Sequence, residues 1–232
     1  MRALFCLLCL IPTLVTAQSK GARTCRILFL GAPAGAPEKL HLFDGTSSQE
    51  VELPQMNLSP IYQLPSGPIT LALLPAAASK PEDVSPDAPK ATVAESITDI
   101  YLLVTSETSN KIAPVKFQVI DVNSIKFRKG QMLWFNLTPN KIVGKVGTQD
   151  LDMATMSKSI LEPPSTKGDD YPVNLSFLMP DNERVYPLCE TKWSHDPRAR
   201  TMFFVVMQSG SRTPRIVGVP DYREAEGKEE KK

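Results

Sequence analysis

The sequence lacks the residue patterns on which most catalytic and metal sites are built. Its 232 residues include only two histidines, His41 and His195, and His41 falls inside an expected strand, where a structural role is the simpler interpretation. No HExxH motif, His/Cys cluster, GxSxG elbow or glycine-rich phosphate loop is present. We therefore predict no catalytic residues, no metal ligands, no cofactor and no enzymatic activity.

An excess of one sign of charge is also missing. Lysine and arginine total 26 against 25 aspartates and glutamates, so no general field attracts the chain to nucleic acid. Sustained helical periodicity is absent too, whereas 21 prolines break the chain into short segments. These features predict strands joined by turns and no nucleic-acid partner.

Residues 1–17 have the pattern of a secretory signal peptide. Arg2 precedes an apolar run over residues 3–15, and Val15 and Ala17 supply the small residues that precede a cleavage point. The run is shorter than the roughly 18 apolar residues of a membrane-spanning helix. We predict an exported protein, periplasmic or secreted, with no transmembrane anchor after cleavage.

Only two of the four cysteines, Cys25 and Cys189, lie outside this peptide. In an oxidising compartment they could form a disulfide that ties the first strand to a late one. Alternatively, they are two separate buried thiols that pack as small apolar side chains. The sequence leaves both alternatives open, because it does not place the two Cα atoms within bridging distance.

Short apolar runs bounded by turn residues recur along the rest of the chain. They predict an all-β fold, an antiparallel β-sandwich of the immunoglobulin-like, Greek-key type. The strongest strand signal covers residues 115–146, where we expect a meander of three or four consecutive strands. One large sandwich and two sandwich units in tandem both fit the pattern.

Four prolines between residues 75 and 90 mark the expected domain boundary. The predicted organisation after the signal peptide has four parts: an N-terminal β unit at 18–76, a proline-rich linker or long loop at 77–98, a C-terminal β-sandwich unit at 99–220, and a charged, disordered tail at 221–232.

An internal repeat is a further hypothesis. Residues 57–60 (NLSP) and 136–139 (NLTP) share an Asn-Leu-hydroxyl-Pro pattern, and similar strand signals precede both. Two related β units would explain the shared order. The alternative is that proline commonly ends a strand.

The loop over residues 193–200 carries the best candidate ligand-binding side chains. It concentrates an aromatic ring, an imidazole, a carboxylate and two guanidiniums, a set that could stack a sugar ring or hold an acidic ligand. The candidate residues are Trp193, His195, Asp196, Arg198 and Arg200. The alternative is a plain strand connection, with Trp193 packed on the core and an arginine paired with a nearby acid.

The expected function is a non-enzymatic binding or structural module of the cell envelope or extracellular space, with an extracellular protein or a carbohydrate as its partner. Two alternatives involve carboxylates. Asp150 and Asp152 would face the same side of a strand, as a carboxylate-dependent hydrolase requires. A calcium-assisted carbohydrate-binding module is the other alternative.

Overall fold

The structure is a computed structural model that describes residues 23–165, 167–181, 184–208 and 210–223. The predicted signal peptide lies outside these residues. Within the described ranges the chain forms sixteen β-strands and one short 3-10 helix, η1 (Pro81–Asp83). This confirms the all-β fold class. None of the helices in the described residues is long and apolar enough to cross a membrane.

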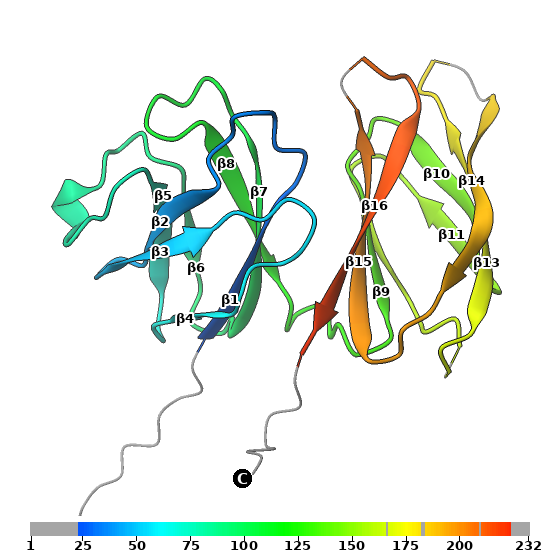
Figure 1. The fold of residues 1–232 in the computed structure, drawn as a ribbon, viewed down its shortest axis with the longest axis horizontal. Helices are drawn as coiled ribbons and strands as arrows, with labels where there is room; N and C mark the ends of the chain where they lie inside the picture. The colour runs from blue at the N-terminus through cyan, green and yellow to red at the C-terminus, as the bar shows by residue number, and fades with distance from the viewer. Residues whose placement is uncertain (1–22, 166, 182–183, 209, 224–232) are drawn as a thin grey trace, which may run out of the picture.

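Eight strands form a first unit and eight form a second (Figure 1). The strands of the first unit are β1 (Arg23–Phe29), β2 (Lys39–Phe43), β3 (Ser48–Glu52), β4 (Tyr62–Leu64), β5 (Ile69–Leu74), β6 (Lys90–Val93), β7 (Asp99–Ser106) and β8 (Val115–Asp121). Those of the second are β9 (Met132–Asn136), β10 (Lys141–Val146), β11 (Gln149–Met153), β12 (Lys158–Leu161), β13 (Asp170–Leu178), β14 (Val185–Ser194), β15 (Ala199–Met207) and β16 (Pro214–Tyr222).

The two units have the same strand topology. The first contains the sheets β3-β2-β5-β6 and β4-β1-β7-β8, and the second contains β11-β10-β13-β14 and β12-β9-β15-β16. Adding eight to each strand number of the first unit gives the second. The one parallel pairing in each unit also corresponds, β1 with β7 and β9 with β15. All other pairings in the described sheets are antiparallel.

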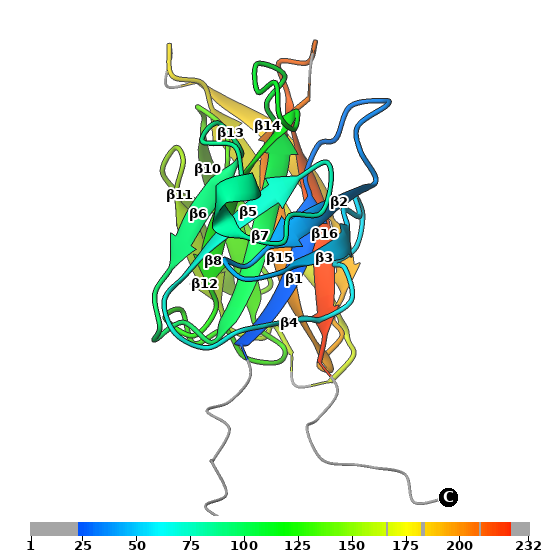
Figure 2. The same cartoon turned by 90° about the vertical axis from the view of Figure 1, so that its left-hand side faces the viewer.

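The four sheets stack as four layers, which Figures 1 and 2 show from two sides. One apolar core fills each sandwich, and a third lies between the two inner sheets, where Tyr101 and Leu103 of β7 share a cluster with Phe135 of β9 and Phe204 of β15. The inner sheets are therefore covered on both faces.

Burial follows from this layering. Strands β9 (MLWFN) and β7 (DIYLLVTS) of the inner sheets are apolar almost without a break, because both of their faces meet a core. Strand β13 (DYPVNLSFL) of an outer sheet alternates, and only its second, fourth, sixth and eighth side chains point inward and are buried. The sequence pattern thus separates inner from outer strands.

The expected meander at residues 115–146 is not formed. Its three strands, β8, β9 and β10, belong to three different sheets. The segment is the passage between the units, and residues 122–131 join the last strand of one to the first strand of the other. Its high apolar content reflects the buried layers that it crosses.

The strand pairing also places the division between the two units elsewhere than in the proline-rich stretch. β6 lies inside the expected linker and pairs with β5, while β7 lies beyond the linker and pairs with β1. The expected tail at 221–232 begins within β16, since Asp221 and Tyr222 pair with β15. Residues 224–232 lie outside the described residues.

The repeated topology does not align the two tetrapeptides. Residues 57–60 lie between β3 and β4, whereas residues 136–139 end β9 and lead into β10. The position in the first unit that corresponds to the end of β9 is the end of β1. The shared NLSP and NLTP patterns are therefore not at equivalent points of the two units.

The hypothesis of a disulfide is wrong in this structure, where both cysteines are free thiols. Cys25 belongs to the core of the first sandwich, and Cys189 packs against the core of the second. Two inner sheets separate these cores. Burial raises the pKa of the Cys25 thiol well above its ordinary value, so the thiol stays protonated.

Gly144 on β10 lies where the backbones of β10 and β13 approach too closely for a side chain to fit, so its substitution tests this close approach. Its φ is +145°, and an added Cβ would overlap the carbonyl oxygen of Asn174 and lie 2.9 Å from the Cα of Leu175. Backbone strain plus displaced strand pairing predicts that Gly144→Ala lowers the free energy of unfolding by about 3 kcal/mol or more. Denaturant-induced unfolding measures the loss.

Gly35→Ala is the matched control. Gly35 also has a positive φ, +79°, but nothing lies within 4 Å of its Cβ position. Its substitution should cost only about 1–2 kcal/mol, the strain of the left-handed backbone alone. Equal losses at the two positions would contradict the close approach of β10 and β13.

Candidate functional site

A pocket of about 260 Å³ opens between the two sheets of the second unit, on the side bounded by β14 and β16. In the first unit the equivalent strands, β6 and β8, pack against each other and close that side. In the part of the chain that the structure describes, β14 and β16 are not packed together in this way. The second sandwich is thus open where the first is closed.

Strand register gathers aromatic rings at this opening. Phe203 of β15 lies directly opposite Trp134 of β9, and Tyr171 of β13 lies opposite Trp193 of β14. The Phe203 ring stacks on both tryptophans, with centroids 4.5 Å from Trp134 and 5.0 Å from Trp193. Tyr171 meets Trp193 edge-on at 6.4 Å. Each such pair adds about 0.5–1.5 kcal/mol beyond the burial of area.

Trp193 is therefore fixed by stacking on Phe203, while part of it still lines the opening of the pocket. Trp134 is fully buried, but Trp193 is only half-buried and lines the pocket. Gly218 of β16 makes room for this arrangement, because a Cβ there would lie 2.9 Å from the Phe203 ring. The wall of the pocket depends on that missing side chain.

The loop after β14 supplies the polar groups. His195 is buried at 8% exposure, its ring meets Tyr171 edge-on, and its Nε2 has no hydrogen-bond partner within the described residues. Burial lowers the pKa of His195, although the charge of Asp196 opposes this. The imidazole is consequently neutral at neutral pH, with one nitrogen a donor and the other an acceptor.

Asp196 is held at the rim by its neighbours. Its carboxylate accepts hydrogen bonds from the Arg198 side chain at 2.8 and 3.0 Å, from the Arg198 backbone and from the Tyr222 hydroxyl. These bonds, chiefly those from the Arg198 side chain, hold the pKa of Asp196 well below its ordinary value. A carboxylate, a guanidinium and a phenol thus stand side by side at the edge of the aromatic wall.

The structure separates the five residues predicted from the sequence. Trp193, His195 and Asp196 line the pocket, and Arg198 flanks it through its pair with Asp196. Arg200 instead turns away, into the interface between the two units. The five residues that were predicted to form one loop site therefore belong to two different places, the pocket and the interface between the units.

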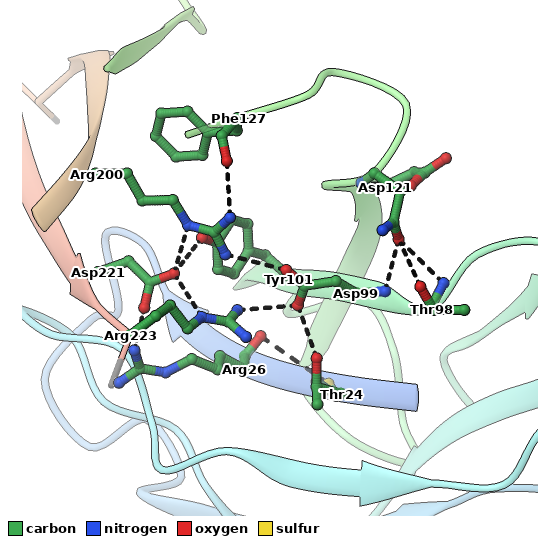
Figure 3. Close-up of polar contacts among 12 residues, drawn as sticks. Thr24, Arg26, Thr98, Asp99, Tyr101, Asp121, Phe127, Arg200, Asp221 and Arg223 are labelled. Atoms are coloured by element: carbon green, nitrogen blue, oxygen red, sulfur yellow. Dashed lines mark hydrogen bonds and ion pairs between the residues drawn. The ribbon is translucent and has the colours of Figure 1, made fainter. Parts of the chain in front are cut away.

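The second structure is a polar network centred on Asp221 (Figure 3). The Asp221 side chain is fully buried and receives three arginines, Arg26 of β1, Arg200 of β15 and Arg223 just after β16. Its Oδ2 also accepts a hydrogen bond from the Tyr101 hydroxyl at 2.5 Å. Residues from both units thus converge on one carboxylate.

Asp99 at the start of β7 is the second acceptor of the network. It accepts hydrogen bonds from Arg200 at 3.0 Å, from Arg223 at 2.9 Å and from the Thr24 hydroxyl at 2.8 Å. Arg200 further donates to the carbonyl oxygen of Phe127, in the segment that joins the units. Three guanidiniums and two carboxylates therefore connect β1 and β7 to β15 and β16.

Burial and the neighbouring charges determine the protonation states of Asp221 and Tyr101 in this network. Burial raises the pKa of Asp221, but the hydrogen bond from Tyr101 and the charges of Arg223 and Arg200 outweigh it, so the pKa lies below the ordinary value of an aspartate. Burial also raises the pKa of Tyr101. The tyrosine stays a donor and the aspartate an acceptor, as their hydrogen bond requires.

Sequence reasoning missed Asp221 and Arg223, because the charged residues after Pro220 indicated a disordered tail. It also missed Asp99, Tyr101 and Arg26, whose partners lie far away in the chain. The one available signal was Arg200, an arginine at the start of a strongly apolar strand, which needs a buried partner.

The carboxylates of the hydrolase alternative lie on the exposed face of β11. Asp150 pairs with Lys145 at 2.8 Å and Asp152 with Lys141 at 2.9 Å, and the two aspartate side chains are 80% and 66% exposed. Within the described ranges, no three His, Cys, Asp or Glu side chains are grouped to hold a metal ion. Neither carboxylate alternative gains support from these positions.

No protein-family model matches the chain, and a search of curated proteins found no significant match. The features that bear on function are therefore the pocket and the network themselves.

Asp221→Asn tests the network. Because the folded pKa of Asp221 is below its unfolded value, its stabilising contribution is present above about pH 4 and is lost as the pH falls through the folded pKa. We expect the variant to lose about 3 kcal/mol of unfolding free energy at pH 7. The difference from the wild type should shrink toward acid pH, as measured by urea unfolding at several pH values.

Asp150→Asn makes the same substitution in an exposed ion pair and should change stability by at most about 1 kcal/mol. A loss at Asp221 that is equally small, or that does not depend on pH, would contradict the role of the buried carboxylate.

Proposed function

We propose that the protein is an exported, non-enzymatic binding module, and that the pocket between β14 and β16 holds one sugar residue of an envelope or extracellular polysaccharide. The observation that carries this proposal is the combination of aromatic walls and hydrogen-bonding groups at one opening. Trp193 offers a ring for stacking, while Asp196, Arg198 and His195 offer an acceptor, a donor and a neutral imidazole. A sugar ring presents an apolar face and hydroxyl groups that match both.

The size of the pocket supports a single small ring. Its volume of about 260 Å³ is just below the roughly 300–1,000 Å³ of sites for drug-sized ligands. Tyr222 is 53% exposed beside Asp196, so further residues of a chain could extend across it. The site thus fits one unit of a longer polymer.

A protein partner that adds a strand to β14 fits less well. This edge strand carries Pro187, Glu190 and Lys192, and its pairing with β13 has an irregularity between Leu175 and Ser176. Proline, charge and bulges on an edge strand all disfavour the addition of another strand. A carbohydrate needs no free strand edge.

Export and fold type complete the proposal. Export is supported by the signal-peptide pattern of residues 1–17. The immunoglobulin-like, Greek-key type is supported by hairpins β2–β3 and β5–β6, which lie in one sheet while β1, β4 and β7 lie in the other. The fold alone does not define the ligand.

Trp193→Ala is the test of the sugar site. Affinity electrophoresis through gels that contain soluble neutral or acidic polysaccharides should retard the wild-type protein in at least one gel. Loss of the stacking ring should weaken that binding about ten-fold or more. Tryptophan fluorescence during titration with the retarding polysaccharide gives the dissociation constants.

Lys192→Ala is the matched control, an exposed residue next to Trp193 on the same strand. Because Trp193 also stacks on Phe203, Asp196→Ala provides a second variant at the pocket's rim, and it should weaken binding without loss of the aromatic stack. Wild-type protein that no gel retards, or binding that survives both pocket substitutions, would refute the proposal.

A further inference from the structure

A second cavity, of about 500 Å³, lies on the outer face of the first unit. Its floor is formed by Phe43 of β2 and Ala72 of β5, which are only 3% and 1% exposed. Pro65, Pro81 and Val84 form its walls. The volume is within the range of about 300–1,000 Å³ that holds small-molecule ligands.

The proline-rich stretch between β5 and β6 builds this cavity. Ala78 and Ala88 pack on Phe43 and on Leu74 of β5, with Val84 beside them. The Ser48 hydroxyl anchors the stretch through two hydrogen bonds of 2.9 Å to the backbone of Ala78. The stretch covers one part of the apolar face of the sheet and leaves the cavity beside it.

Among the described residues, the equivalent outer sheet of the second unit has no buried apolar cluster on its outer face like that of Phe43, Ala72 and Leu74. Its exposed side carries the Lys141–Asp152 and Lys145–Asp150 ion pairs across β10 and β11. Two units of one topology therefore differ here, and the first keeps buried apolar side chains on a face that the second gives to water. Such a face with a cavity above it is suited to an apolar ligand.

The charges at the cavity specify one end of that ligand. Asp44 lines the cavity, but its carboxylate accepts four hydrogen bonds from the backbone and hydroxyls of Thr46 and Ser47. Lys90 of β6 also lines it, directly opposite Ala72, and its ammonium has no ion-pair or hydrogen-bond partner among the described residues. Asp44 keeps its negative charge, but its oxygens already accept hydrogen bonds within the protein, so the charged group that is free to bond a ligand is the Lys90 ammonium.

We propose that this cavity binds an amphipathic carboxylate, with the alkyl chain on Phe43 and Ala72 and the carboxylate at the Lys90 ammonium. The site is independent of the sugar pocket, since it lies on the other unit and shares no residue with it. A charge-assisted hydrogen bond at the rim would orient the ligand, and the apolar floor would supply most of the affinity.

Titration calorimetry of the purified protein with decanoate and with decylammonium tests this proposal. A ligand of this size in an apolar cavity should bind with a dissociation constant of about 0.1 mM. Decanoate should bind at least about ten-fold more tightly than decylammonium, because only the anion complements Lys90. Equal binding of the two, or no binding of decanoate by folded protein, would overturn the proposal.

Two pairs of variants locate the site. Lys90→Gln should weaken decanoate binding about ten-fold, whereas Lys80→Gln, at an exposed lysine outside the cavity, should not. Thr70→Trp should fill the cavity and abolish binding. Its control is Thr213→Trp, at an exposed threonine of the second unit that is outside the cavity lining, which should bind normally. Thr70→Trp protein that binds decanoate as the wild type does would also overturn the proposal.

Discussion

The buried carboxylate of Asp221 is the constraint on which the arrangement of the four layers depends. Three arginines and a tyrosine converge on it, and they come from strands of both units. Each guanidinium would be costly to bury alone, and the two carboxylates, Asp221 and Asp99, make that burial possible. The apolar cluster between the inner sheets stabilises the contact between the units but does not select one orientation, because apolar packing is not directional. The hydrogen bonds and ion pairs of the network fix how the units are oriented.

The same network also supports the proposed sugar site. Arg200 lies on β15 and Asp221 on β16, and these strands carry Phe203 and Gly218, which shape the wall of the pocket. A displacement of β16 at the interface would therefore move the pocket's wall as well. The interface and the pocket are opposite faces of one inner sheet, so the rigidity of one supports the preorganisation of the other.

Sequence patterns predicted the fold class and pointed to three of the residues that line the pocket, but not to its remaining walls or to the network. Alternation in β13 and the apolar runs of β7 and β9 depend on local burial, which a sequence displays directly. Trp193, His195 and Asp196 are neighbours in the chain, so their grouping was visible. The pairing of Arg26 with Asp221 joins the first and the last strands, and no local pattern reports such a contact. The prediction of a meander at 115–146 was wrong for a related reason. Consecutive apolar strands have the same sequence pattern whether they pair in one sheet or belong to three different sheets.

Differential scanning calorimetry tests the central claim, that the shared interface makes the two units one cooperative body. Two sandwiches that were joined only by the chain would unfold independently. The account predicts a single transition in which the calorimetric enthalpy equals the van't Hoff enthalpy. Two resolved transitions, or a calorimetric enthalpy about twice the van't Hoff value, would contradict it.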